Sequence, residues 1–230
     1  ATCINNRPEV LRLYTYILTN YKGNRKELSK ERTYEHLFPG KTYSPSVLRY
    51  TMHYLYRQIE TFLVQKSVSQ RPLDYSFQAL SIWRKRNCEK SSKASMKKLK
   101  KELTSGKTIS TEWFRRNYLL EKEVYEVSAV QQRRAPKNLQ SLNDSLDLSY
   151  LAEKLKNCCL ALSHQAVVKV RYDTGLLPFV LDYLQDNPLL QRHPLIGLYY
   201  HYFMAETTEK SNPHFSALRR LMETAPSTIE

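Results

Sequence analysis

The sequence predicts an all-α protein, and two observations carry that prediction. Apolar side chains recur at helical spacing in three stretches: Leu48 to Phe62, Trp113 to Val127 and Leu148 to Leu162. In each stretch they step by four and three residues, with Asn117 as the one polar member of the second stretch, which places them on one face of a helix. No stretch shows the strict alternation of a half-buried strand, and no Asn-Gly or Asp-Gly hairpin turn occurs.

Helix boundaries follow from capping residues and from proline. Ser44-Pro45 predicts a helix start, because a capping side chain is followed by proline at the first helical position. The helix that it starts is expected to span residues 46–66. Pro8 predicts an earlier helix that reaches Tyr21, and Ser29 predicts the cap of a short one that ends before Phe38.

The second part of the chain is expected to hold short, closely spaced helices. Residues 133–141 have linker composition, so we place a domain boundary there, between residues 1–137 and residues 138–230. Successive antiparallel helices joined by short turns are typical of stacked helix pairs. The helices expected after the linker span 145–163, 165–173, 177–186, 194–206 and 212–223.

Charge is distributed unevenly along the chain. The formal net charge is +14, with 36 Lys and Arg against 22 Asp and Glu. Residues 1–137 carry 28 of the basic and 12 of the acidic side chains, and residues 138–230 carry the rest. A basic region attracts polyanions at long range, so this imbalance concerns partners rather than fold.

The composition indicates a cytoplasmic protein. No apolar run approaches the roughly 18 residues that span a bilayer, and the first residues lack the apolar segment of a signal peptide. Cys158 and Cys159 are neighbours, and neighbouring cysteines do not pair without strain. Free thiols are therefore expected, as in a reducing compartment. We expect no membrane partner.

The sequence contains none of the common catalytic or metal-binding motifs. It lacks a phosphate-binding loop, a GxSxG nucleophile elbow, HExxH and any Cys-His cluster with zinc spacing. We therefore expect neither an enzyme nor a bound metal or cofactor. An enzyme whose site is assembled between helices is the minor alternative, with His164, Cys158 and Cys159 as the residues to watch.

A lysine-rich tract is the first candidate binding site. A basic amphipathic helix can meet nucleic acid, an acidic partner or an anionic membrane surface, whereas many such faces are simply solvated. The candidate nucleic-acid-binding residues of this tract are Lys93, Lys97, Lys98, Lys100 and Lys101.

A tyrosine cluster is the second candidate. Tyr199, Tyr200 and Tyr202 lie within five residues of His201 and Phe203. Rigid aromatic side chains anchor peptides at little entropic cost, so these tyrosines are candidate partner-binding residues. The alternative is that they fill helix–helix contacts, with rings buried and hydroxyls at the rim.

The stretch 28–40, with its Leu-Ser-Lys-Glu start and Leu-Phe-Pro-Gly end, is followed by Leu48-Arg49-Tyr50 and Leu55-Tyr56-Arg57. It resembles the helix-turn-helix of bacterial transcriptional activators that carry a helical-repeat domain behind it. The resemblance covers residues 9–66 and implies a three-helix unit whose last helix enters the major groove. Arg49, His53 and Arg57 would then read DNA.

Over most of its length the chain resembles an uncharacterised family of Tyr-rich, all-helical bacterial proteins. The residues that carry this are Leu-Phe-Pro-Gly at 37–40, Leu-Gln-Ser-Leu-Asn-Asp at 139–144, Leu-Ser-His-Gln at 162–165 and Leu-Tyr-Tyr-His at 198–201. The resemblance implies a right-handed α-solenoid of short antiparallel helices, tetratricopeptide-like, that continues beyond Glu230. It implies no activity.

Two functions follow from these expectations. The first is a non-enzymatic helical-repeat scaffold that binds a protein or peptide partner. The alternative is a nucleic-acid-binding, transcription-regulator-like protein that uses the basic N-terminal part.

Overall fold

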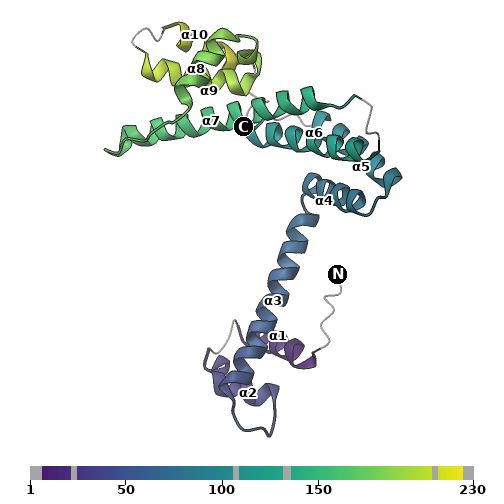
Figure 1. The fold of residues 1–230 in the computed structure, drawn as a ribbon. Coiled ribbons are helices and arrows are strands. Elements are labelled where there is room, and N and C mark those ends of the chain that lie inside the picture. Colours follow the sequence, from purple (N-terminus) through teal and green to yellow (C-terminus); the bar gives the residue numbers. More distant parts are fainter. Residues whose placement is uncertain (1–6, 22–24, 106–108, 132–135, 209–211, 225–230) are drawn as a thin grey trace. The chain divides into compact units, whose positions relative to one another are not determined.

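The structure is a computed structural model that describes residues 7–21, 25–105, 109–131, 136–208 and 212–224. The described residues form ten α-helices and two short 3-10 helices, without a β-strand, so the all-α prediction is confirmed. The solenoid arrangement stays a prediction. In chain order (Figure 1) the elements are α1 Pro8–Asn20, η1 Arg25–Leu28, α2 Lys30–Leu37, α3 Pro45–Ser69, α4 Pro72–Lys85, α5 Glu89–Ser105, α6 Thr111–Gln131, α7 Leu139–Val167, α8 Leu177–Asp186, η2 Leu190–Arg192, α9 Pro194–Thr207 and α10 Asn212–Thr224.

The chain divides into two compact units. Unit 1 is residues 1–75 and unit 2 is residues 76–230. The domain boundary expected between residues 137 and 138 lies within unit 2, between α6 and α7. The two divisions rest on different properties, packing in one case and linker composition with charge in the other, and the second stays a prediction.

Unit 1 is held together by a small core between α1, α2 and α3. The backbone N–H of Arg32 donates to the side chain of Ser29, which caps α2 as the sequence predicts. Pro45 is the first residue of α3, again as predicted. The buried apolar side chains of this core are Val10, Leu13, Tyr34, Leu37, Leu48 and Leu55.

The apolar stripe of α3 is only partly buried. Leu48 and Leu55 lie in the core, whereas Met52, Ile59 and Phe62 are exposed. Helical spacing shows which side chains share a face, but among the described residues the α3 side chains in the core with α1 and α2 come from the first half of this long helix. The second half of α3 therefore carries uncovered apolar surface.

Unit 2 has a larger core, built around α7. Leu151, Leu155 and Cys158 of the predicted α7 stripe are buried, and side chains from α6, α8 and α9 pack around them. Gly197 in α9 is also buried, and a Cβ at this position would collide with the backbone carbonyl oxygen of Gln191. Glycine is needed there because the two backbones approach closely.

One expected helix is absent. Residues 165–173 were expected to form a helix of their own, but α7 continues to Val167 and residues 168–174 lie outside any helix. The β-branched Val168 and Val170 in this segment disfavour a helical turn. The other helices expected after the linker are present as α7, α8, α9 and α10.

The length and polarity of the helices are informative in one further respect. Among the described residues, no helix is both long enough and apolar enough to cross a membrane.

Candidate functional site

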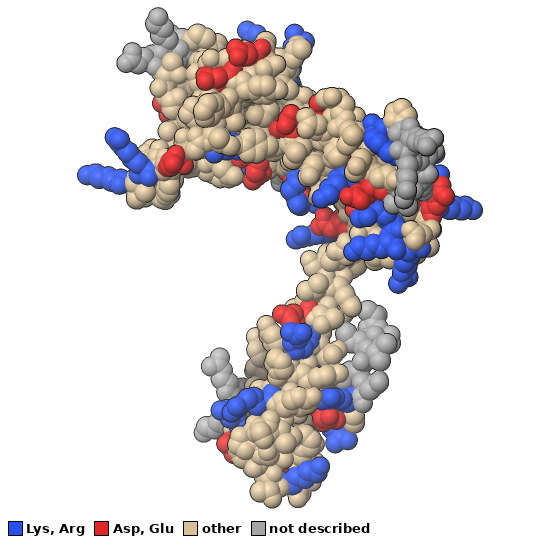
Figure 2. Space-filling view, viewed as in Figure 1, with Lys and Arg blue, Asp and Glu red and all other residues tan. Residues whose placement is uncertain are grey.

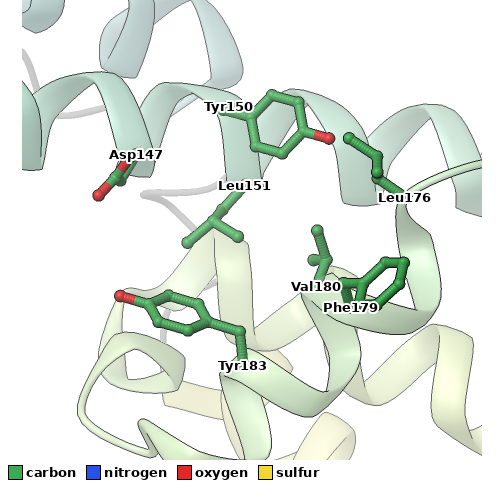
Figure 3. A pocket seen from close by; sticks show the side chains of 7 residues that line it. All are labelled: Asp147, Tyr150, Leu151, Leu176, Phe179, Val180 and Tyr183. Atoms are coloured by element: carbon green, nitrogen blue, oxygen red, sulfur yellow. The ribbon is translucent and has the colours of Figure 1, made fainter.

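An open groove lies between α7 and α8 in unit 2. It encloses about 380 Å³, within the range of ordinary ligand pockets. Leu151 and Val180 are buried and form its floor. The walls are large apolar side chains that remain exposed to solvent (Figure 3), namely Tyr150, Leu176, Phe179 and Tyr183.

Helical spacing explains why these side chains face one another. Phe179 and Tyr183 are four residues apart, so they project from the same side of α8, and Val180 and Leu184 turn to the core. On α7, Tyr150 stands beside the core residue Leu151 and projects toward the groove (Figure 3). The α8 segment thus presents one buried face and one aromatic face.

The connection between α7 and α8 fixes one end of the groove. The ammonium group of Lys154 donates to the carbonyl oxygen of Thr174 at 2.6 Å. The backbone N–H of Gly175 donates to a carboxylate oxygen of Asp173, and Gly175 has a positive φ of 54° that glycine adopts without strain. These contacts place Leu176 at the groove wall.

Three polar side chains line the groove. The Asp147 carboxylate and the Tyr150 and Tyr183 hydroxyls have no hydrogen-bond or ion-pair partner among the described residues. Figure 3 shows the Asp147 carboxylate and the Tyr183 hydroxyl at the same end of the groove, and Leu176 at the opposite end. The cavity is therefore apolar along its length and acidic at one end.

Helix α5 carries the five candidate lysines, and all of them are exposed. Lys93 pairs with Glu89, and Lys98 lies 3.7 Å from Glu102. Lys97, Lys100 and Lys101 have no ion-pair partner within the described ranges. Basic side chains gather over α4 and α5 in Figure 2. These lysines form an exposed cationic face, and their role in nucleic-acid binding stays a prediction.

The candidate DNA-reading residues lie on α3 of unit 1. Arg49, His53 and Arg57 are exposed, and they follow one another at four-residue steps. Tyr50 beside them accepts a hydrogen bond from Arg7. The structure brings the three residues onto one surface, and their role in DNA binding stays a prediction.

The three candidate tyrosines belong largely to the core. Tyr200 is 3% exposed and Tyr199 packs against the same core. Burial raises the pKa of both phenols. Tyr202 is half-buried, and its hydroxyl shares a hydrogen bond with that of Ser163 at 3.1 Å. These positions fit the helix-contact interpretation, and partner binding by the three stays a prediction.

The residues of the minor enzyme hypothesis do not form a reactive cluster. Cys158 and Cys159 are buried free thiols, and burial raises the pKa of Cys159 to about 12. His164 is exposed, and its Nδ1 lies 2.8 Å from the hydroxyl of Tyr172. Within the described ranges, no group of three or more His, Cys, Asp and Glu is placed to hold a metal ion.

Sequence reasoning did not identify the groove. Its aromatic residues come from segments about 30 positions apart, and only the packing of α8 on α7 brings them together. The available signal was the spacing of Phe179 and Tyr183 on a short helix whose opposite side holds the core residues Val180 and Leu184.

Comparisons with known proteins give no match. No family model matches the chain, no curated protein matches it, and no solved structure resembles it significantly. The two resemblances described above therefore remain expectations from the sequence.

Proposed function

We propose that the chain is a non-enzymatic helical scaffold that binds a peptide segment of a protein partner in the groove between α7 and α8. The observation that supports this most is the exposure of the groove's walls. Phe179 is 72% exposed, although it stands directly above a buried floor. Clustered apolar side chains that remain in water are typical of interaction sites.

The shape and composition of the groove suit a peptide. Aromatic rings with few rotatable bonds lose little entropy on binding and dominate interface energetics. The unpaired hydroxyls of Tyr150 and Tyr183 can bond to a peptide backbone. The groove is open along its length, so an extended or helical segment can enter from the side.

A displayed library of random peptides, selected on the immobilised full chain, tests the proposal. Enriched peptides are resynthesised with a fluorescent label and titrated by anisotropy. We expect dissociation constants in the micromolar range and a loss of about 30-fold or more in Phe179→Ser with Tyr183→Ser, as for interface hot spots of about 2 kcal/mol.

The control is Leu160→Ser. Leu160 is also an exposed apolar residue of α7, at 59% exposure, but it does not line the groove. It should leave peptide affinity unchanged. If no peptide is enriched, or if the enriched peptides bind the groove variant as well as the wild type, the proposed function is wrong.

A second candidate function is supported by the lysine face of α5. Lys97, Lys100 and Lys101 are exposed cations without acidic partners among the described residues. Neutralising phosphates with such side chains releases counterions, which favours nucleic-acid binding at low salt. The DNA-binding alternative places the reader in α3 instead, at Arg49, His53 and Arg57.

A salt-titrated duplex-binding assay separates these sites. Lys100→Gln with Lys101→Gln should reduce the slope of log affinity against log salt by about two if α5 is the site. Arg49→Ala with Arg57→Ala should weaken binding if α3 is the reader. Lys169→Gln with Arg171→Gln is the charge-matched control on another exposed segment. Absence of duplex binding by the wild type would eliminate this function.

A further inference from the structure

We infer that the partner segment that fits the α7–α8 groove is cationic and amphipathic, with bulky apolar side chains followed by Arg or Lys. This inference rests on the proposed function and specifies the chemistry of the partner. It comes from the charge of the two helices that form the groove and from the position of Asp147 within it.

The helices that form the groove are acidic although the chain is basic. Residues 139–150 of α7 and all of α8 contain no Lys or Arg. They contain four aspartates, in a chain whose formal net charge is +14. A field of one sign around an apolar cleft attracts the opposite charge and repels the same charge. These aspartates are Asp144, Asp147, Asp182 and Asp186.

The acidic groups are available to a partner. Asp147, Asp182 and Asp186 have no ion-pair partner among the described residues. Asp144 accepts one hydrogen bond from the Gln140 amide at 2.7 Å. Asp144 lies one turn before Asp147 on α7, and Asp186 lies one turn after Tyr183 on α8. Asp147 lines the groove, and Asp144 and Asp186 lie one helical turn from its lining residues.

The groove also has a direction. The Asp147 carboxylate and the Tyr183 hydroxyl mark one end (Figure 3), where both can accept hydrogen bonds from basic side chains of a partner. At the other end, Lys154 is held by the carbonyl of Thr174 and Leu176 extends the apolar wall. Apolar side chains of the segment lie between Phe179 and Tyr150, and its basic residue lies at Asp147.

Three short labelled peptides of equal length test the inference on the full chain by fluorescence anisotropy. The first contains two leucines followed by two arginines, the second replaces the arginines with glutamines, and the third replaces them with glutamates. At about 50 mM salt the first should bind at least about tenfold more tightly than the third, with the second between them. This preference should shrink at about 500 mM salt.

Asp147→Asn is the decisive variant. It should weaken the arginine peptide about threefold to fivefold and leave the glutamine peptide unchanged, because only the charged end of the groove is altered. Glu206→Gln is the control, since it removes an exposed carboxylate of α9 that does not line the groove.

The outcomes distinguish this inference from the function on which it rests. If the three peptides bind equally and all lose affinity in Phe179→Ser with Tyr183→Ser, the groove binds peptides but the inferred charge preference is wrong. If none of the peptides binds and the displayed library also yields none, both ideas are wrong. Tightest binding of the glutamate peptide would also overturn the inference.

Discussion

Unit 1 and unit 2 bury very different amounts of apolar surface. Among the described residues, the core of unit 1 has six buried apolar side chains and that of unit 2 has eleven. Stability grows with the area buried, so a small core leaves little margin over the entropy of the unfolded chain. In unit 1, moreover, the second half of α3 lies outside the core altogether. The comparison shows that a long helix such as α3 does not by itself give its unit a large core.

The largest expected effect comes from removing a core leucine in either unit. Leu13 in unit 1 and Leu155 in unit 2 are both fully buried, and truncation to Ala should cost about 2–5 kcal/mol locally. Both tryptophans of the chain, Trp83 and Trp113, lie in unit 2. Tryptophan fluorescence in a urea titration thus reports on unit 2, while far-ultraviolet circular dichroism reports on both units.

Leu13→Ala should move part of the dichroism transition to lower urea concentration and leave the midpoint of the fluorescence transition unchanged. Leu155→Ala should lower the fluorescence midpoint. If Leu13→Ala shifts both signals equally, the two units unfold as one cooperative body and the comparison fails.

The second effect concerns glycine. Gly197→Ala should destabilise unit 2 by about 1–3 kcal/mol, since its Cβ meets the backbone carbonyl of Gln191, which cannot rotate away. Gly40→Ala in unit 1 has open space around the new Cβ but a φ of +76°, so its cost is the conformational strain of about 1 kcal/mol. The urea midpoint measured by tryptophan fluorescence should decrease in Gly197→Ala and not in Gly40→Ala. An equal decrease in both variants would contradict the interpretation that each change acts within its own unit.

A smaller effect is expected from a partly buried ion pair of unit 2. The guanidinium of Arg84 on α4 donates to the carboxylate of Glu123 on α6 at 2.9 Å, and neither side chain is more than 27% exposed. Arg84→Gln should cost about 1 kcal/mol, whereas Lys100→Gln on the solvated lysine face should be neutral within about 0.5 kcal/mol. The urea midpoint measures both. A neutral Arg84→Gln would show that this pair contributes nothing.

The smallest effect is the pH dependence of unit 2. Burial lowers the pKa of His193 and of His201 below the ordinary 6.5, and His214, whose Nδ1 lies 3.0 Å from that of His201, adds to the shift of His201. The unfolded chain therefore binds more protons between these lowered pKa values and 6.5. The stability of unit 2 should be complete above pH 6.5 and fall as the pH decreases through this window.

Fluorescence-monitored urea midpoints at about pH 7.5 and pH 5.5 measure this decrease, above the range in which carboxylates titrate. His201→Gln should reduce the difference between the two midpoints. An unchanged difference would assign the effect to other groups.

Much of the fold could be predicted from the sequence because its signals are local. Ser29 and Pro45 mark helix starts through backbone chemistry that involves only their neighbours. The exposure of Met52 and the non-helical course of residues 168–174 depend instead on what packs nearby, and periodicity does not report that.

The groove could not be predicted from the sequence for the same reason, because it depends on which helices pack together. Phe179 and Tyr150 resemble any other exposed aromatic residues until α8 is placed on α7. The tyrosines at 199, 200 and 202 drew attention because they are adjacent in sequence, yet Tyr200 is in the core. Clustering along the chain is a weak guide to clustering on the surface.

The buried thiol of Cys159 on α7 can serve as a probe of local opening in unit 2. The Cys159 sulfur lies 3.4 Å from the carbonyl oxygen of Tyr199 on α9, and its raised pKa leaves almost no thiolate at neutral pH. We therefore expect an alkylating reagent to reach Cys159 only when α7 and α9 separate, and to react faster with the less buried Cys88. In a Cys3→Ser, Cys88→Ser, Cys158→Ser background, the labelling rate of Cys159 measures that separation under native conditions.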